Sequence, residues 1–458
     1  MFADLDGRKG DELIVSTDNG RVHAYRPNGP ELTGWPVRTS VPKYWPTDSP
    51  TAQDDGIDAP GSGITTGAPV VADLDDDGDL EVVVNDLDGN VWAWEHDGTR
   101  RAGFSPTAVG GATVSKVRID PAFSDDDPAT GKNSLNRTKR GMAASPSAGD
   151  LDGDGDLEIV VAALDRHVYA WHDDGTPVDG FPVLVVDPAK VAAVDPVTHY
   201  VTFSAGSGVR EGGELITTPS LGDLTGDGRP EIIVGAQEEY EEPVNIGSGP
   251  DVLGLLSVAG ALGNARLHAL SPEGTDASNP DSSSAHPDEQ AYLPGWPVPL
   301  GMLQLEALPT IGDGVSAAAA IGDVHPSAGP EIVAASAVGP LYALNAAGDS
   351  VYGQVGGKDV PMLWSGGVGG QDDGRFGVNR NSEDLVASPI AFGGPALGTL
   401  DGDPVPDISA PTAGLTRLID ILASDLQLPN DDHLMAWRGR DGTRSRGSRR
   451  RQPTSPSS

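Results

Sequence analysis

Cysteine is absent from this chain of 458 residues, which excludes disulfide bonds, thiolate metal sites and cysteine nucleophiles. Long apolar runs are absent too. The longest, residues 252–262, is too short to cross a bilayer as a helix, and no signal peptide follows Met1. No Gly-x-Ser-x-Gly elbow, phosphate loop or dinucleotide fingerprint is present. The sequence therefore predicts no membrane insertion and lacks these signatures of catalysis.

Basic residues are scarce: 30 Lys and Arg stand against 68 Asp and Glu, which gives a formal net charge of −38. A surface of this sign repels nucleic acid and anionic membranes, because both are bound mainly through Lys and Arg. It favours cations instead. We therefore expect no nucleic-acid partner, and the placement of the acidic residues becomes the informative feature.

An acidic phrase recurs six times along the chain. It reads APVVADLDDDGDLEVVV from Ala68, returns as ASPSAGDLDGDGDLEIVV and TPSLGDLTGDGRPEIIV, and is fainter in three further copies. In chain order, the copies place their first loop residue at Asp4, Asp73, Asp150, Asp223, Asp323 and Thr399. The separations are 69, 77, 73, 100 and 76 residues, and such a sustained period is typical of repeat architectures.

A second short run follows each acidic phrase after a turn. It reads VHAY, VWAW, VYAW, LHAL, LYAL and LMAW, beginning at Val22, Val91, Val168, Leu267, Leu341 and Leu434. Neighbouring side chains of a strand point to opposite faces, so Val91 and Ala93 are expected on one face and Trp92 and Trp94 on the other. Small residues facing large ones are what closely stacked sheets require.

Each period carries about four short strands, separated by turns rich in Gly, Pro and Asp. No segment shows a sustained helical period. The predicted fold class is all-β, a β-propeller of four-stranded blades, with an array of β-sandwiches as the alternative. Six visible repeats fit a six-bladed ring or an incomplete seven-bladed one. The propeller is expected over residues 1–437, and the Arg/Ser/Pro-rich tail 438–458 is expected to be disordered.

The acidic loop itself predicts a metal site. In copy three, Asp150, Asp152 and Asp154 alternate, and Gly155 lets the loop turn sharply so that their carboxylates can converge. Calcium takes about six to eight hard oxygen ligands, and closely spaced carboxylates repel one another without a cation. An EF-hand begins alike but needs Glu at position twelve, where this loop has Val161. A solvated Asp-Gly turn without an ion is the alternative.

The ordered signature from Gly34-Trp35-Pro36 through Gly67-Ala68-Pro69 to Asp73 resembles FG-GAP or VCBS-type repeats, whose best-known members are the propellers of integrin α subunits. The resemblance covers roughly residues 1–437. It implies calcium held by side chains at loop positions one, three, five and nine and by a main-chain carbonyl at position seven. In that order, the implied ligands are Asp73, Asp75, Asp77, Glu81 and the carbonyl of Asp79 in copy two, Asp150, Asp152, Asp154, Glu158 and the carbonyl of Asp156 in copy three, and Asp223, Thr225, Asp227, Glu231 and the carbonyl of Arg229 in copy four.

The other three loops depart from this pattern. In copy one Arg8 replaces the fifth-position acid, copy five keeps only Asp323 and Glu331, and copy six has Pro404 in place of Gly. We therefore expect Ca²⁺ at copies two and three, and also at copy four, where Thr225 replaces the third-position acid. Copies one, five and six each lack at least one acid of the pattern together with its sixth-position Gly, so no ion is predicted there.

Calcium is near millimolar outside cells and would fill such loops there, so an extracellular or cell-surface location is expected. Loops on a propeller rim commonly form a binding surface. The expected function is a calcium-binding module that binds or displays a protein or carbohydrate ligand within a larger secreted or surface protein, and is not an enzyme. A secreted glycoside hydrolase or polysaccharide lyase on the same propeller is the alternative, since fold does not fix function.

Two smaller expectations concern polar residues outside the metal loops. The nine histidines are scattered, and His23 and His268 lie in predicted strands, where a packed or hydrogen-bonded role is expected rather than catalysis. The run Glu-Glu-Tyr-Glu-Glu at residues 238–242 is expected to be a solvated loop.

Overall fold

The computed structural model describes residues 1–39, 65, 67–109, 112–123, 141–247, 261–275, 285–304, 313–327, 329–337, 339–361, 390–391, 393–400, 402, 404–413, 433–438 and 450–451. In this part of the chain the regular structure is β-strand, apart from three short 3₁₀ turns at Ala102–Phe104, Pro188–Lys190 and Glu289–Ala291. None of these helical turns has the length and apolar character needed to cross a membrane. The predicted fold class, an all-β propeller, is confirmed.

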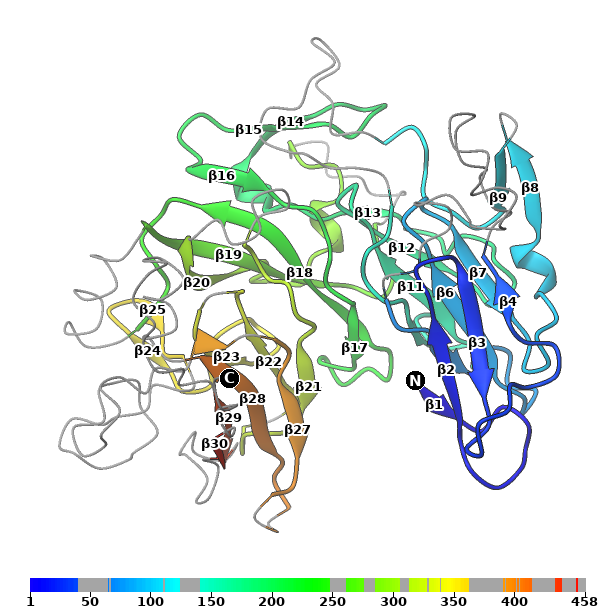
Figure 1. The fold of residues 1–458 in the computed structure, drawn as a ribbon. Coiled ribbons are helices and arrows are strands. Elements are labelled where there is room, and N and C mark those ends of the chain that lie inside the picture. The colour runs from blue at the N-terminus through cyan, green and yellow to red at the C-terminus, as the bar shows by residue number, and fades with distance from the viewer. Residues whose placement is uncertain are drawn as a thin grey trace, which may run out of the picture.

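Six antiparallel sheets, which we call blades one to six, follow one another along the chain (Figure 1). Blade one consists of β1 (Phe2–Ala3), β2 (Glu12–Ser16), β3 (Arg21–Tyr25) and β4 (Val37–Arg38); blade two of β5 (Val70–Ala72), β6 (Glu81–Asn85) and β7 (Val91–Trp94); and blade three of β10 (Ser147–Gly149), β11 (Glu158–Ala162), β12 (His167–Trp171) and β13 (Val183–Leu184). In each of these blades every strand pairs with the next one along the chain.

The later blades are more varied. Blade four consists of β16 (Val209–Gly212), β17 (Ser220–Gly222), β18 (Glu231–Tyr240), β19 (Ala261–Leu270) and β20 (Val298–Gln304); blade five of β21 (Ala320–Gly322), β22 (Glu331–Ala335) and β23 (Leu341–Leu344); and blade six of β26 (Ile390–Ala391), β27 (Ala396–Gly398), β28 (Asp407–Ala413), β29 (His433–Arg438) and β30 (Arg450–Arg451). Three hairpins lie between blades: β8 (Pro106–Val109) with β9 (Ala112–Ser115), β14 (Val191–Val194) with β15 (Val201–Phe203), and β24 (Gln354–Val355) with β25 (Lys358–Asp359).

The predicted alternation of small and large residues packs one blade on the next. Trp92 and Trp94 share a buried cluster with Val22 and Ala24 of blade one. On the other face of the same sheet, Ala93 and its neighbour Val91 pack with the aromatic residues of β12 in blade three. The two sets therefore point to opposite faces, as the sequence predicts. Burial of apolar side chains on both faces is what holds consecutive blades together.

The same contact continues through the remaining blades. Small residues of β12 pack against blade four, those of β19 against Tyr342 in blade five, and those of β23 against Trp437 in blade six. The first strands of neighbouring repeats also lie side by side, in the order β5, β10, β17, β21 and β27. Sheets that stack in chain order around adjacent inner strands form a propeller.

Blade one has one face that is only partly covered. The positions that correspond to Trp92 and Trp94 are His23 and Tyr25, which are half-buried, and Leu13 on the same face is exposed. The equivalent residues of blades two and three are buried. Both predicted arrangements, six blades or part of seven, are compatible with this open face.

The run at residues 238–242 is not a solvated loop, so that prediction was wrong. Glu238, Glu239 and Tyr240 end strand β18 and are buried. The partner of Glu238 comes from the neighbouring strand: His268 Nε2 lies 2.7 Å from Glu238 Oε2. Tyr240 donates a second hydrogen bond to the same carboxylate. Hydrogen bonds of this kind offset the cost of burying a charge, and the packed role expected for His268 is confirmed.

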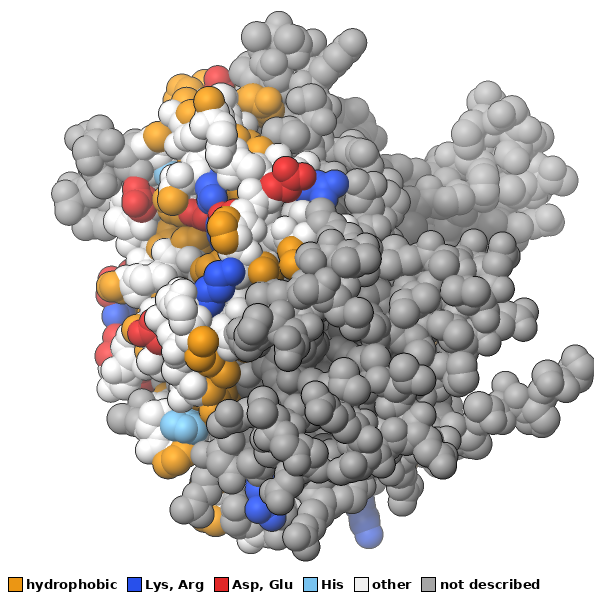
Figure 2. All heavy atoms as spheres, turned by 90° about the vertical axis from the view of Figure 1, so that its left-hand side faces the viewer, with side chains coloured by type: hydrophobic (Ala, Val, Ile, Leu, Met, Phe, Trp, Pro, Cys, Tyr) orange, Lys and Arg blue, Asp and Glu red, His pale blue; other side chains and the backbone are white. Residues whose placement is uncertain are grey.

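The described side chains on the face that lies at the left of Figure 1 are of mixed type. Figure 2 shows that acidic, basic and apolar side chains are interspersed on the described part of this face. Of the basic tail, Arg450–Arg451 form β30 and pair with β29. The other residues beyond Arg438 lie outside the described ranges, so the predicted disorder of the tail is untested.

A buried carboxylate closes the hairpin between β6 and β7 and leads to a first prediction. Asp86 is fully buried and accepts hydrogen bonds from Asn90 N (2.9 Å) and Trp92 Nε1 (2.8 Å). Burial nevertheless raises the pKa of Asp86 to about 6. The folded chain therefore takes up this proton at a higher pH than the unfolded chain, so stability attributable to Asp86 rises as the pH falls below about 7.

We expect the stability of the wild-type chain relative to Asp86→Asn to increase by about 1 kcal/mol between pH 7 and pH 5. The measurement is urea unfolding of both proteins at the two pH values with calcium held saturating, because titration elsewhere cancels in the difference. A relative stability that stays constant, or that decreases as the pH is lowered from 7 to 5, would contradict the prediction.

Candidate functional site

Each acidic loop connects the first two strands of the repeated hairpin. In blades two, three and four, the last residue of the first strand pairs with the ninth-position Glu, as Ala72 does with Glu81. The sixth-position residues Gly78, Gly155 and Gly228 have φ of +94°, +105° and +96°. Side-chain-bearing residues rarely adopt this left-handed conformation, so Gly permits the sharp turn that returns the chain to the second strand.

The first-position carboxylate organises the loop around itself. Asp73 accepts hydrogen bonds from Asp77 N (3.1 Å) and Gly78 N (3.0 Å). Asp223 does the same in copy four, with Asp227 N at 3.2 Å and Gly228 N at 3.0 Å. These bonds draw the loop inward around the first-position carboxylate.

The ninth-position acid has a role that the sequence reasoning missed. In every copy its carboxylate accepts a hydrogen bond of 2.7–3.0 Å from the main-chain N–H of loop position two. The six acids are Glu12, Glu81, Glu158, Glu231, Glu331 and Asp407. The sequence did hold a signal for this role: position nine is acidic in all six copies, including copy five, where the acids at positions three and five are lost. One of its oxygens fastens the loop to the sheet, so only the other is free for an ion.

Copy two has buried oxygens without a partner. Ligand atoms of Asp73, Asp75 and Glu81 lie within 4.8 Å of one another. Among the described residues, Asp75 Oδ1 and Glu81 Oε1 have no hydrogen-bond partner, although both atoms are buried. Burial raises the pKa of Glu81 to about 7, against the opposing effects of the Leu74 N–H and the Arg101 guanidinium. Two unsatisfied buried oxygens are unfavourable by about 1–3 kcal/mol each unless something binds them.

Arg101 joins this loop to the next blade. Its Nη2 lies 2.8 Å from Asp75 Oδ2 and 2.7 Å from Asp173 Oδ2, and its Nε donates to the Asp173 carbonyl at 2.9 Å. The guanidinium therefore uses one oxygen of Asp75 and leaves the other, Oδ1, for an ion. Because Asp173 belongs to the turn after β12, loop two is tied to blade three as well as to its own sheet.

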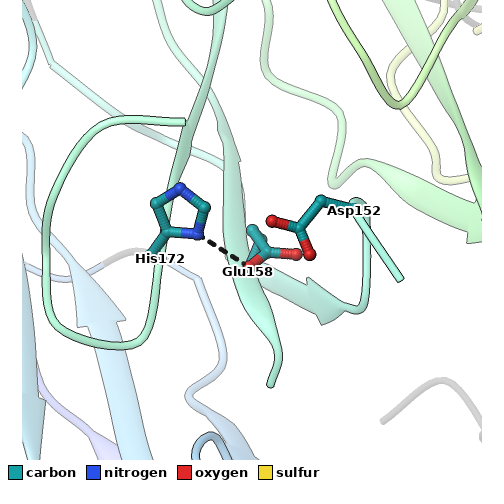
Figure 3. Close-up of side chains that lie close together, drawn as sticks. All are labelled: Asp152, Glu158 and His172. Atoms are coloured by element: carbon teal, nitrogen blue, oxygen red, sulfur yellow. Dashed lines mark hydrogen bonds and ion pairs between the residues drawn. The ribbon is translucent and has the colours of Figure 1, made fainter. Parts of the chain in front are cut away.

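Copy three brings together two overlapping groups. Ligand atoms of Asp150, Asp152 and Asp154 lie within 4.8 Å of one another, and so do those of Asp152, Glu158 and His172. Figure 3 shows the carboxylates of Asp152 and Glu158 next to the imidazole ring, whose Nδ1 lies 3.1 Å from Glu158 Oε1. Burial raises the pKa of Glu158, while the Leu151 N–H and His172 act in the opposite direction. His172 was not among the predicted ligands.

In copies four and five a hydroxyl occupies the free oxygen of the ninth-position acid. Thr225 Oγ1 donates to Glu231 Oε1 at 3.0 Å, and Ser327 Oγ donates to Glu331 Oε1 at 2.6 Å. Thr225 therefore lies next to Glu231, as its predicted place in the ligand set requires. In copy five the hydroxyl satisfies the acid without an ion.

Copy one carries its own cation. Arg26 Nε lies 3.1 Å from Asp6 Oδ2, within the loop where Asp4, Asp6 and Glu12 converge. In copy six, Asp407 is paired in the sheet register with Arg438, while Asp401 and Asp403 lie outside the described residues. Arg26 therefore supplies positive charge in a loop that departs from the calcium pattern.

The remaining predicted residues lie at the rims of the loops. Asp77 accepts a hydrogen bond from Asp79 N at 2.9 Å, and the Asp79 side chain is exposed. Arg229 directs its side chain to Glu273, with Nη2 2.7 Å from Oε1. The side chains of Asp79 and Arg229 thus point away from the loop, which suits residues expected to offer only their carbonyls, as Asp156 also is. The carbonyl ligands stay a prediction.

Comparison with known proteins gives structural neighbours only. No family model matches the chain, and no curated protein matches it. Similar solved structures include the C-terminal domain of PilY1 from Pseudomonas aeruginosa, 12% identical over 95% of this chain and 80% of that one, with a TM-score of 0.39. Others are a rhamnogalacturonan lyase of Bacillus licheniformis, 14% identical over 93% and 57% with a TM-score of 0.39, and the V. cholerae biofilm matrix protein Bap1, 13% identical over 96% and 78% with a TM-score of 0.31. These neighbours are β-propeller proteins, and the resemblance to FG-GAP repeats stays a prediction.

Proposed function

We propose that this chain is a calcium-stabilised β-propeller that acts as an extracellular binding or display module. The observation that carries the proposal is the pair of buried, unpartnered oxygens in copy two, Asp75 Oδ1 and Glu81 Oε1, beside Asp73. A buried carboxylate oxygen without a donor is normally satisfied by a cation or an ordered water. Carboxylates grouped around such a position favour a cation.

Calcium fits copy two better than softer ions. The three converging side chains offer only carboxylate oxygens, which are the ligands that calcium prefers, whereas zinc favours nitrogen and sulfur. The set supplies three ligands, and water and a main-chain carbonyl commonly complete a calcium sphere. The proposed loop therefore combines Asp73, Asp75 and Glu81 with the implied carbonyl of Asp79.

Copy three supports the same reading through Asp150, Asp152 and Asp154, which also converge as carboxylates. Copy four shows no convergent group of three acids among its described residues, and its Thr225–Glu231 bond makes it a weaker candidate. In copy one Arg26 pairs with the third-position Asp6, and in copy five Ser327 satisfies the second oxygen of Glu331. We propose two principal calcium sites on this basis.

An extracellular setting follows from the expected affinity. Loops with few protein ligands bind calcium in the range of extracellular modules, about 10⁻⁴–10⁻³ M, and calcium reaches that concentration outside cells. The ligand would be a protein or carbohydrate carried on the propeller loops. The proposed module is not catalytic.

The test is binding of the chain to glycan and protein arrays, with millimolar calcium and with chelator. We expect retention of a specific ligand with calcium, weakened at least tenfold by chelator, because loosened blades no longer hold the loops in place. The copy-five variant Asp323→Ala should bind like the wild type, while Asp75→Ala should lose binding. Equal binding in chelator would contradict the calcium-dependent module, and turnover of a polysaccharide by the chain would contradict the non-enzymatic role.

A further inference from the structure

One position across the hairpin from the metal loop carries different types of residue in different blades. The ninth-position acid begins the second strand of each hairpin, and antiparallel pairing places a fixed residue across from it. For Glu158 this residue is His172, one step beyond the pair formed by Ile159 and Trp171. In blades one to six the residue at this position is Arg26, Glu95, His172, Ser271, Asn345 and Arg438.

The contacts show that this position reaches the loop. Arg26 Nε lies 3.1 Å from Asp6, and His172 Nδ1 lies 3.1 Å from Glu158. In copy two, Glu95 lies 3.6 Å from the Arg101 guanidinium that also contacts Asp75. The residue across from the acid therefore adds a cation in copy one, an acid near copy two and an imidazole in copy three.

We propose that His172 makes loop three a site for a borderline transition-metal ion such as Zn²⁺, held by Asp152, Glu158 and His172. One ligand atom from each of the three lies within 4.8 Å of the others. Imidazole nitrogen with carboxylate oxygen is a donor set that zinc accepts, and three protein ligands leave a fourth position for water. Calcium, by contrast, takes oxygen ligands and gains nothing from the imidazole.

The burial of the three side chains suits an accessible site. Glu158 is fully buried and accepts a hydrogen bond from the Leu151 N–H, so this ligand is held in a fixed position. Asp152 is exposed, and about a third of the His172 side chain is open to solvent (30%), which lets an ion enter. Without an ion, the imidazole and Glu158 share a hydrogen bond; on binding, the metal takes the place of the shared proton.

Loop three then holds two ligand sets, one for calcium and one for zinc, which compete because Asp152 belongs to both. The part of the inference that concerns competition rests on the proposed calcium function; the zinc set does not. Loop two is spared this competition, since its converging group contains acids alone. The chain would thus distinguish its loops by ion type through a single cross-strand residue.

The test uses the full chain, stripped of metal, with Zn²⁺ measured by calorimetry and Co²⁺ by its visible absorption. The main variant is His172→Asn, which installs the residue that copy five carries at the same register position. The control is His199→Asn, because His199 Nδ1 lies 2.9 Å from His167 Nε2 and that pair could also take zinc. We expect His172→Asn to weaken Zn²⁺ binding at loop three by at least about tenfold and to remove the Co²⁺ absorption, with His199→Asn unchanged.

Calcium titrations of the same proteins separate the two proposals. Calcium binding that is intact in His172→Asn, with zinc binding lost, supports both. Zinc binding that depends on His172 in a chain that takes no calcium would overturn the proposed function and leave the zinc set standing. Zinc binding equal in the wild type and His172→Asn would overturn the inference.

Discussion

Chelation of calcium is expected to lower the melting temperature of the chain by roughly 5 °C. An ion that binds only the folded state stabilises it by about 2.7 kcal/mol per site at a hundredfold excess over the dissociation constant, which about 10 mM calcium provides for a dissociation constant of about 10⁻⁴ M. Two occupied sites would contribute about twice that, which a chain of this size registers as several degrees. The measurement is a thermal melt followed by circular dichroism, with millimolar calcium and with chelator.

Glu81→Gln separates the metal effect from the role of the side chain in the sheet. The amide oxygen can still accept the Leu74 N–H that Glu81 Oε2 accepts at 2.8 Å. The substitution removes the charge on the buried, unpartnered Oε1. We therefore expect the variant to be at least as stable as the wild type in chelator and to gain about half as much from calcium.

Glu331→Gln in copy five is the matched control. Glu331 occupies the same loop position and is equally buried, but both of its oxygens have partners, from the Val324 N–H and Ser327 Oγ. The calcium-induced shift of this variant should equal that of the wild type. A wild-type melting temperature that does not respond to chelator, or a Glu331→Gln shift as small as that of Glu81→Gln, would contradict calcium binding at copy two.

The blade order could be predicted from the sequence because consecutive repeats are also neighbours in space. Alternation along VWAW was enough to place Val91 on one face and Trp92 on the other, and the buried clusters follow that pattern. The spacing of the acids likewise predicted that Asp150, Asp152 and Asp154 converge and that Asp73 lies with Asp75, whereas Asp77 is not in the group that converges in loop two. In both cases the cause is local: a strand has a fixed period, and a short loop has few ways to turn.

Contacts that depend on tertiary register were not predictable in the same way. Arg101 contacts Asp173, which lies 72 residues further along the chain, and no other repeat of the first five has an arginine at the corresponding position. His172 could have been found by counting the hairpin register from Glu158, but its proximity to the loop depends on that register holding. The acids at residues 238–242 looked solvated because their cationic partners lie in other elements, and charge alone gave no sign of burial.

The cations that accompany these acids form a network that holds the insert before β16 against blade four. Arg266 Nε lies 2.7 Å from Asp187 Oδ2, and its Nη1 lies 2.8 Å from Glu242 Oε1. Lys190 pairs with the same Glu242 at 2.6 Å, and Arg266 also lies over the Tyr240 ring. Arg266 and Asp187 are both buried, so neither can exchange its partner for water.

Arg266→Met is expected to destabilise the chain by about 3–5 kcal/mol, because it leaves the buried Asp187 carboxylate without its cation. Adding Asp187→Asn should recover part of that loss, since the unpaired charge is then gone. The control is Arg229→Met, whose partner Glu273 is exposed, and it should cost less than about 1 kcal/mol. Urea unfolding in saturating calcium measures all three, and equal losses for Arg266→Met and Arg229→Met would show that the buried network does not hold the insert in place.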